Sequence, residues 1–287
     1  MRFVFVFGVG RSGTTLLGRL LAQTRTPSRF VAELCPGIPD RIPNPVFMVE
    51  PEDGATIGRV RDALFELAAG KLQLAPDQAW RLERDDADAQ VVLVKDVHSL
   101  LAWPAIVEGL PDWRAVVISR ETSRVLDSQL RKRGNRAYLA EDYAWLARHI
   151  DAHPRDPRIE RVASSLPARL TDYLRRPRLL TRDLLRRALA VEFIARFLRD
   201  WAERDARVVH VEFQTLCRDP LGEAIRLFEL LDLDCDDETL DRVRRTTTGD
   251  SDEYYATDKD SRGILDQPYR MLSPRQRRRL ARFLGGS

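Results

Sequence analysis

Short apolar runs alternate along the chain with segments in which apolar residues recur every three to four positions. The short runs are typical of buried strands, and the longer spacing is typical of helices with one buried face. The predicted strands cover residues 3–7, 29–34, 91–95, 114–119 and 207–212. The predicted helices cover residues 14–23, 56–70, 100–108, 122–132, 221–231 and 274–284, and a helical insertion covers about 138–204. This alternation predicts an α/β fold whose central parallel sheet, of about five strands, is covered by helices on both faces.

The first predicted strand runs directly into a glycine-rich loop, Gly8-Val-Gly-Arg-Ser-Gly-Thr-Thr15, and a predicted helix follows. Glycine allows tight turns close to a ligand, and the start of a helix presents unpaired N–H groups to an anion. The loop therefore predicts a phosphate-binding site in a three-layer fold like that of P-loop NTPases. Its candidate binding residues are Gly10, Arg11, Ser12, Gly13, Thr14 and Thr15.

Two other nucleotide-binding patterns fit the same glycines. Read as a Walker A loop, the segment carries Thr14 where a nucleoside triphosphatase needs a lysine on the β- and γ-phosphates. Read as a dinucleotide fingerprint, the three glycines are followed about twenty residues later by Glu33, where a ribose-binding acid is expected. A P-loop small-molecule kinase and a Rossmann-type NAD(P) or flavin oxidoreductase are therefore the alternatives.

A second segment, far downstream, completes a resemblance to a known family. Trp113-Arg-Ala-Val-Val-Ile-Ser119 reads as a buried strand, Arg120 follows it at once, and Ser128 lies on the next predicted helix. Together with the glycine loop, this segment resembles the sulfotransferases that use 3′-phosphoadenosine 5′-phosphosulfate (PAPS), in the branch with an Arg-Ser-Gly-Thr-Thr loop. The resemblance implies that the glycine loop holds the 5′-phosphosulfate and that Arg120 and Ser128 hold the 3′-phosphate.

The resemblance also carries expectations about the end of the chain and about the reaction. Asp258-Lys-Asp-Ser-Arg-Gly263 resembles the family's loop over the 3′-phosphate, which adds Lys259 and Arg262 as candidates. The family transfers the sulfuryl group directly and needs no metal. The expected acceptor is a hydroxyl or amine of a small molecule, a glycan or a lipid. Segments 34–50 and 138–182, where we expect the acceptor to bind, contain no recognisable motif.

Sulfuryl transfer needs a base for the acceptor and cations where negative charge develops. The candidate cations are Arg11 and Lys95. For the base, the resemblance offers Glu33, at the end of the second predicted strand, and His98. The sequence Lys95-Asp-Val-His98 resembles the Lys-Thr-His motif of the family's cytosolic branch with one residue added. We favour Glu33, because its placement needs no insertion within a short motif.

Length and charge limit the other possibilities. A chain of 287 residues could form one large domain or two small ones. We expect a single domain over residues 1–287, because the candidate ligand loops extend from Gly8 to Arg262. The net charge of +3 gives no indication of a nucleic-acid partner. The sequence leaves the oligomeric state open.

Cysteine and histidine positions, together with hydropathy, complete the expectations. Cys35, Cys217 and Cys235 form no CxxC pair, which predicts free thiols and a cytoplasmic location. No apolar run approaches ~18 residues, so we expect no membrane span. His149 and His153 have helical spacing but lack the HExxH pattern, so we expect no metal site there.

Overall fold

A computed structural model describes residues 1–38, 53–131, 146, 156–176, 179–248 and 261–285, with the side chains of 261 and 262 left out. Its centre is a six-stranded sheet with the order β3-β2-β4-β1-β5-β6. The strands are β1 (Arg2–Phe7), β2 (Ser28–Ala32), β3 (Leu82–Asp85), β4 (Val91–Asp96), β5 (Trp113–Ser119) and β6 (Val208–Glu212). Five are parallel, and β3 pairs antiparallel with β2 at one edge. The predicted α/β class is confirmed, and β3 is added to the five predicted strands.

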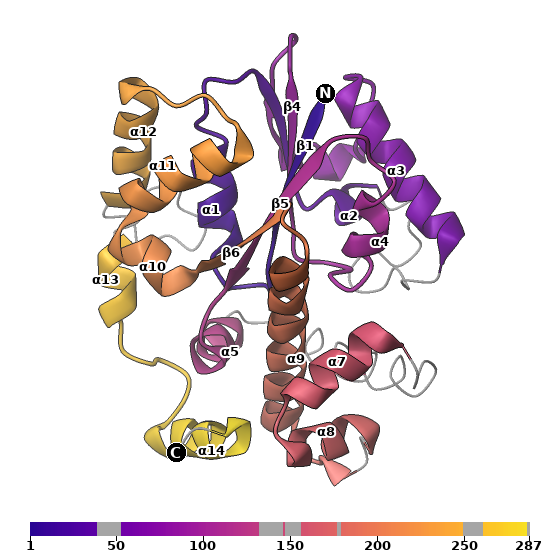
Figure 1. Cartoon of the computed structure of the whole chain (residues 1–287). Coiled ribbons are helices and arrows are strands. Elements are labelled where there is room, and N and C mark those ends of the chain that lie inside the picture. The colour runs from indigo at the N-terminus through magenta and orange to yellow at the C-terminus, as the bar shows by residue number, and fades with distance from the viewer. Residues whose placement is uncertain (39–52, 132–145, 147–155, 177–178, 249–260, 286–287) are drawn as a thin grey trace.

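The strand order determines which loops become neighbours. β1 lies between β4 and β5, with Phe7 opposite both Asp96 and Val117. β2 pairs with β4 instead of β1, with Ala32 opposite Lys95. The carboxyl ends of the parallel strands, where open α/β sheets bind ligands, lie at the lower end of the sheet in Figure 1. The loops after β1, β2, β4 and β5 therefore share this edge.

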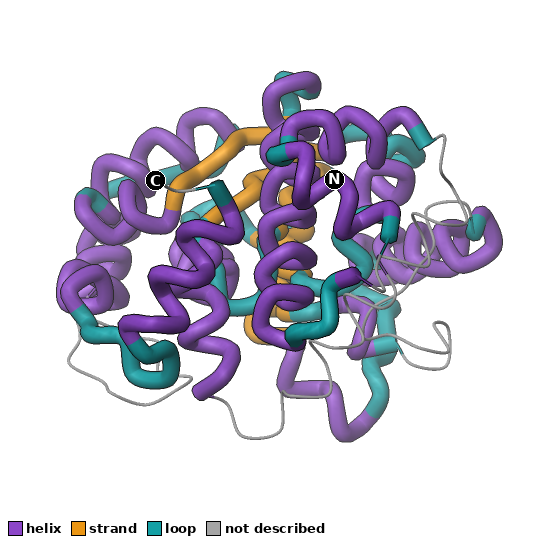
Figure 2. Tube along the Cα trace, turned by 90° about the horizontal axis from the view of Figure 1, so that it is seen from below, coloured by secondary structure: helices purple, strands orange, loops and turns teal. Residues whose placement is uncertain are grey.

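Helices cover both faces of the sheet, as Figure 1 and the view from below in Figure 2 show. One face is covered by α1 (Thr14–Leu21), α10 (Phe213–Arg218), α11 (Pro220–Leu231) and α12 (Asp237–Thr248). The other is covered by α3 (Gly54–Ala68), α4 (Trp103–Val107) and α9 (Asp183–Arg204). The lower helices in Figure 1 are α5 (Thr122–Arg131), α7 (Pro157–Ser165), α8 (Ala168–Arg175) and α14 (Pro274–Leu284). The short elements are α2 (Leu34–Gly37), η1 (Pro76–Arg81) and α13 (Ser261–Asp266).

Alternate side chains of β1 build two cores. Phe3, Phe5 and Phe7 are buried with the residues of α3, α4 and α9, whereas Val4 and Val6 are buried with those of α1 and α11. A strand that is apolar on both faces is typical of the middle of a parallel sheet. This position holds the glycine loop at the centre of the carboxyl edge.

Most predicted elements are present, with differences at their ends. β2 ends at Ala32, so Glu33 is the first residue after the strand and not its penultimate member. The chain then forms the single helical turn α2, for which the sequence had no helical pattern. The predicted insertion over 138–204 contains α7, α8 and α9 among its described residues. The strand β3 and the helix α12 were not predicted, since both are short in apolar residues.

Candidate functional site

The glycine loop has a backbone that requires glycine at two positions. Gly13 has a φ of +108°, and a Cβ there would lie 2.3 Å from the ring of Phe213. A Cβ at Gly8 would lie 2.6 Å from the carbonyl oxygen of Ile118. Gly10 differs, because a Cβ there would meet no atom of the described residues within 4 Å. The loop is therefore packed against β5 and α10 at both ends and open in the middle.

The loop and the helix after it fit an anion. Gly13 caps α1 without a side-chain hydrogen bond, so the first-turn N–H groups, those of Thr14 and Thr15 included, have no acceptor within the helix. Ser12 is 1% exposed, and its Oγ has no hydrogen-bond partner among the described residues. A buried hydroxyl without a partner costs about 1–3 kcal/mol. An oxyanion in the loop would provide acceptors for these donors.

The structure brings the second predicted anion loop against the first. Arg11 donates from Nε to Oγ of Ser128 at 3.1 Å. Arg120 approaches the carbonyl oxygen of Arg11 with Nη1 at 3.4 Å. Gln129 donates from Nε2 to the carbonyl oxygen of Gly10 at 2.9 Å. Two segments more than a hundred residues apart thus form one cluster.

Arg120 is a buried cation whose surroundings disfavour its charge. Its guanidinium lies 4.3 Å from the centre of the Phe213 ring. Within the described part of the chain it forms no ion pair with a carboxylate. Burial lowers the pKa of Arg120 to about 10, and the nearby charges of Arg124 and Arg11 contribute. An anion bound here would compensate for the lost hydration.

Glu33 and Lys95 face each other at the ends of adjacent strands. Nζ of Lys95 lies 2.6 Å from Oε1 of Glu33, and Arg81 donates from Nη1 to Oε2 at 2.6 Å. Burial raises the pKa of Glu33, but the charges of Lys95 and His98 and the hydrogen bonds of Lys95 and Arg81 outweigh it. The pKa is consequently lowered to about 2. In this arrangement Glu33 is a stable carboxylate and a weak proton acceptor.

His98 is held by a fully buried carboxylate. Oδ1 of Asp96 lies 2.9 Å from Nδ1 of His98 and accepts from its backbone N–H at 2.8 Å. Oδ2 of Asp96 accepts from the backbone N–H of Cys35 at 3.1 Å. A carboxylate on Nδ1 fixes the orientation of the imidazole ring. The two candidate bases therefore differ: Glu33 is bound to Lys95 and Arg81, and His98 is held by Asp96.

Backbone strain gathers at this edge of the sheet. Among the described residues other than glycine, four have a positive φ: Arg11 at 81°, Glu33 at 66°, Ser99 at 53° and Asp232 at 54°. The first three lie in the loops after β1, β2 and β4, whereas Asp232 ends α11. Such conformations cost about 1–3 kcal/mol each and cluster at functional sites.

Two predicted binding residues have no described side chain. Lys259 lies outside the described residues, as do His149 and His153. Arg262 belongs to α13, but its side chain is not described. Their assignment to the 3′-phosphate stays a prediction.

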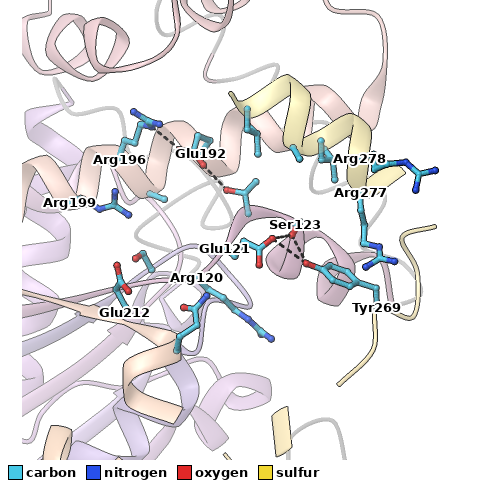
Figure 3. Close-up of a pocket in the computed structure, with 17 residues that line it drawn as sticks. Arg120, Glu121, Ser123, Glu192, Arg196, Arg199, Glu212, Tyr269, Arg277 and Arg278 are labelled. Atoms are coloured by element: carbon cyan, nitrogen blue, oxygen red, sulfur yellow. Dashed lines mark hydrogen bonds and ion pairs between the residues drawn. The ribbon is translucent and has the colours of Figure 1, made fainter. Parts of the chain in front are cut away.

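A cavity of about 570 Å³ lies beyond the ends of β5 and β6 (Figure 3). The start of α5, one side of α9, and α14 enclose it, and Arg120 and Glu212 come from the ends of β5 and β6. Arg11, Glu33, Lys95 and His98 are not among its lining residues. Among the predicted site residues whose side chains are described, Arg120 alone lines this cavity.

Several contributors to the site were not predicted. They are Arg81, Asp96, Phe213 and Gln129, which contact Glu33, His98, Arg120 and Gly10 respectively. Asp96 and Gln129 lie next to predicted residues, so local sequence offered a weak signal. Arg81 and Phe213 come from distant segments, and only the folded chain brings them to the site.

The strand order and the carboxylates bear on the two alternatives. A dinucleotide-binding sheet places the strand after the glycine loop beside β1, whereas here β4 separates β2 from β1. For a kinase, Asp96 is the acid at the end of the strand beside β1, but both of its oxygens bind protein groups. In the described part of the chain no three His, Cys, Asp or Glu residues are placed to hold a metal. The strand order therefore disfavours the dinucleotide-binding alternative, and the contacts of Asp96 disfavour a role for it in binding magnesium.

Comparisons with known proteins find similarity in structure only. No protein-family model and no curated protein matches the sequence. The sulfotransferase domain of the Synechococcus PCC 7002 olefin synthase aligns over 100% of this chain and 95% of its own, at 15% identity and a TM-score of 0.47. A sulfotransferase from Alicyclobacillus acidocaldarius aligns over 98% and 90%, at 17% identity and a TM-score of 0.45. A mouse sulfotransferase complexed with PAP aligns over 98% and 82%, at 9% identity and a TM-score of 0.45.

At these identities and TM-scores, the similarity between this chain and the three sulfotransferases is one of backbone course alone. No disulfide joins Cys35, Cys217 and Cys235; the first two are buried and the third is exposed. Among the residues that the structure describes, we find no helix with the length and apolar character that crossing a bilayer requires.

Proposed function

We propose that this chain is a sulfotransferase that moves a sulfuryl group from PAPS to a hydroxyl or amine of a small-molecule, glycan or lipid acceptor. The observation that carries the proposal is the joining of two anion loops from distant segments. Arg11 of the first loop reaches Ser128, and Arg120 of the second reaches the backbone of Arg11. A donor with anionic groups at both its 5′ and 3′ positions suits two adjacent loops of this kind.

The donor's two ends are assigned to different residues. The amides of the glycine loop and Oγ of Ser12 face the 5′-phosphosulfate, and Arg11 binds one of its oxygens. Arg120 and Ser128 bind the 3′-phosphate. Three features of the described residues support the fit: the Ser12 hydroxyl has no partner among them, Arg120 has no ion-pair partner among them, and the space at Gly10 is open.

Transfer then follows from the groups at the carboxyl edge. Glu33 takes the proton of the acceptor hydroxyl as its oxygen forms a bond to sulfur. The bond from sulfur to the 5′-phosphate oxygen breaks, and adenosine 3′,5′-bisphosphate (PAP) leaves. Arg11 and the ammonium of Lys95 stabilise the charge on that oxygen. Because the pKa of Glu33 is about 2 while Lys95 is bound to it, Lys95 must first leave Oε1.

His98 is the second candidate for the base. Its contact with the buried Asp96 is the arrangement that orients a histidine for proton transfer. The kinetics of the variants Glu33→Gln and His98→Ala decide between the two bases.

Ligand binding measured by thermal shift tests the proposal. PAP at 100 times its dissociation constant should add about 2.7 kcal/mol to the unfolding free energy. We expect a clear rise in melting temperature with PAP, a much smaller one with adenosine 5′-phosphate, and none with NAD or NADP. Equal effects of PAP and adenosine 5′-phosphate, or a larger effect of NAD, would contradict the assignment. Transfer of labelled sulfate from PAPS to a panel of acceptors then identifies the substrate class.

A further inference from the structure

We propose that Arg81 is the positioning residue for Glu33: it holds one carboxylate oxygen in place while Lys95 leaves the other to serve the donor. This inference rests on the proposed sulfuryl transfer. It assigns a role to a side chain from the segment before β3, which no sequence pattern connects with the site.

Arg81 is fixed more firmly than a surface arginine. Its side chain is 10% exposed, and Nη1 lies 2.6 Å from Oε2 of Glu33. Nε donates to Oε1 of Gln78 at 2.6 Å, and Nη1 also approaches the carbonyl oxygen of Ala32 at 3.4 Å. The guanidinium lies 4.4 Å from the centre of the Trp80 ring. These contacts fix both the position and the plane of the guanidinium.

The backbone that carries Arg81 is tied to the segment that carries Glu33. The N–H of Ala75, just before η1, donates to the carbonyl oxygen of Gly37 in α2 at 3.2 Å. A Cβ at Gly37 would lie 3.6 Å from Cδ of Arg81, so the arginine stem packs against α2. Because α2 begins directly after Glu33, the base and its anchor belong to one packed unit.

Arg81 and Lys95 hold the two oxygens of Glu33 in different ways. Lysine is a point charge on a flexible stem, whereas the planar guanidinium of arginine keeps its orientation through several bonds. When Lys95 moves to the leaving oxygen of the donor, Oε1 becomes available to the acceptor proton and Arg81 keeps Oε2. Loss of the Lys95 charge raises the pKa of Glu33 above its value of about 2, which makes it a stronger proton acceptor. The φ of 66° at Glu33 leaves its backbone strained. The bond to Arg81 therefore keeps the carboxylate in its orientation when Lys95 moves away.

The test is the variant Arg81→Met, with Arg29→Met as a matched control. Arg29 is also a buried arginine: counting all of its atoms, the residue is 8% exposed, against 9% for Arg81. It bonds Asp85 of β3 at 2.7 Å and the carbonyl oxygen of Ala68 at 2.7 Å, and it does not contact Glu33. Arg81→Met should lower kcat by about 10–100-fold with the KM for PAPS and the affinity for PAP nearly unchanged. Arg29→Met should change neither value beyond about twofold, and Arg81→Lys should recover part of kcat.

The pH dependence separates positioning from general damage. Arg81 favours the ionised form of Glu33, so its removal raises the pKa of that carboxyl. The active, ionised form is lost as pH falls through this pKa, so the acid limb of kcat should move to higher pH in Arg81→Met and stay in place in Arg29→Met. An equal loss of kcat in both variants, or an acid limb that does not move, would overturn the proposal.

A carbon-13 NMR titration of the glutamate carboxyls keeps this test independent of transfer. Glu33→Gln identifies the Glu33 signal, whose midpoint should rise in Arg81→Met and not in Arg29→Met. A midpoint that does not move refutes the role of Arg81 even if PAPS is the donor. Conversely, absence of any stabilisation of the unmodified protein by PAP refutes the proposed function while the titration still reports on Arg81.

Discussion

Replacing Arg120 by methionine should weaken ligand binding and at the same time stabilise the empty protein. The change removes the charge and keeps an apolar stem against Phe213, on which the guanidinium now lies at 4.3 Å. The two effects have opposite signs. Burial makes the charge of Arg120 unfavourable without a ligand, and the same burial strengthens its attraction to a bound anion. Most damaging core substitutions, by contrast, lower ligand affinity and the stability of the empty protein together.

The structure gives a magnitude for each effect. A charge-assisted hydrogen bond contributes about 1.5–3 kcal/mol, so the dissociation constant of PAP should rise about 10- to 150-fold. Without ligand, the lowering of the pKa of Arg120 from its ordinary value to about 10 corresponds to about 3 kcal/mol against the charged form. Loss of the contact with Phe213 costs about 0.5–2 kcal/mol. We expect the unfolding free energy of the empty protein to rise by about 1–2 kcal/mol.

Urea unfolding without ligand and calorimetric titration with PAP measure the two quantities. Arg207→Met is the control. Arg207 also stacks on a ring, that of Trp113 at 4.0 Å, but it lies directly before β6 and pairs with Asp205 at 2.8 Å. It should leave PAP affinity unchanged and lower stability slightly. A loss of stability in Arg120→Met, or an unchanged affinity for PAP, would refute the account of Arg120 as a cation held for a 3′-phosphate.

Further predictions concern catalysis, metal and acid. Glu33→Gln should lower kcat by about 10²–10⁴-fold with PAP affinity nearly intact, whereas abolition of turnover by His98→Ala with Glu33→Gln active would make His98 the base. Binding of PAP and transfer should survive EDTA; an absolute magnesium requirement with turnover of ATP would indicate a kinase. Because the pKa of Glu33 is lowered from 4.5 to about 2, its contribution to stability is complete above about pH 4.5 and is lost as pH falls through 2. The urea midpoint should therefore fall more steeply over this range in the unmodified protein than in Glu33→Gln.

Local patterns were sufficient to predict the parts of the site that are continuous in sequence. An apolar run followed by spaced glycines predicted β1, its loop and α1, since each needs only its own neighbours to form. Spacing alone could not bring Arg11 to Ser128, because 117 positions separate them along the chain. The family resemblance assigned both residues to one donor, and the structure places the two side chains 3.1 Å apart.

The remaining parts depend on contacts that no local pattern encodes. Strand β3 has the sequence Leu-Glu-Arg-Asp, which has no strand pattern of its own. It forms a strand because its backbone pairs with the edge of β2. Arg81 precedes it and reaches Glu33 for the same reason. The sequence also could not predict the weak basicity of Glu33, because it depends on two cations, from β4 and η1, that bind its two carboxylate oxygens.

The positive φ angles of Arg11, Glu33 and Ser99 bear on how this protein would evolve in the laboratory. Glycine tolerates such angles, so selection for heat resistance alone should repeatedly yield glycine at these three positions. Each such change would relieve the backbone strain and delete a side chain from the edge of the sheet at which we propose that the donor binds and reacts. Libraries screened for survival at high temperature should therefore accumulate robust but inactive proteins, and those screened for turnover should retain the unfavourable angles.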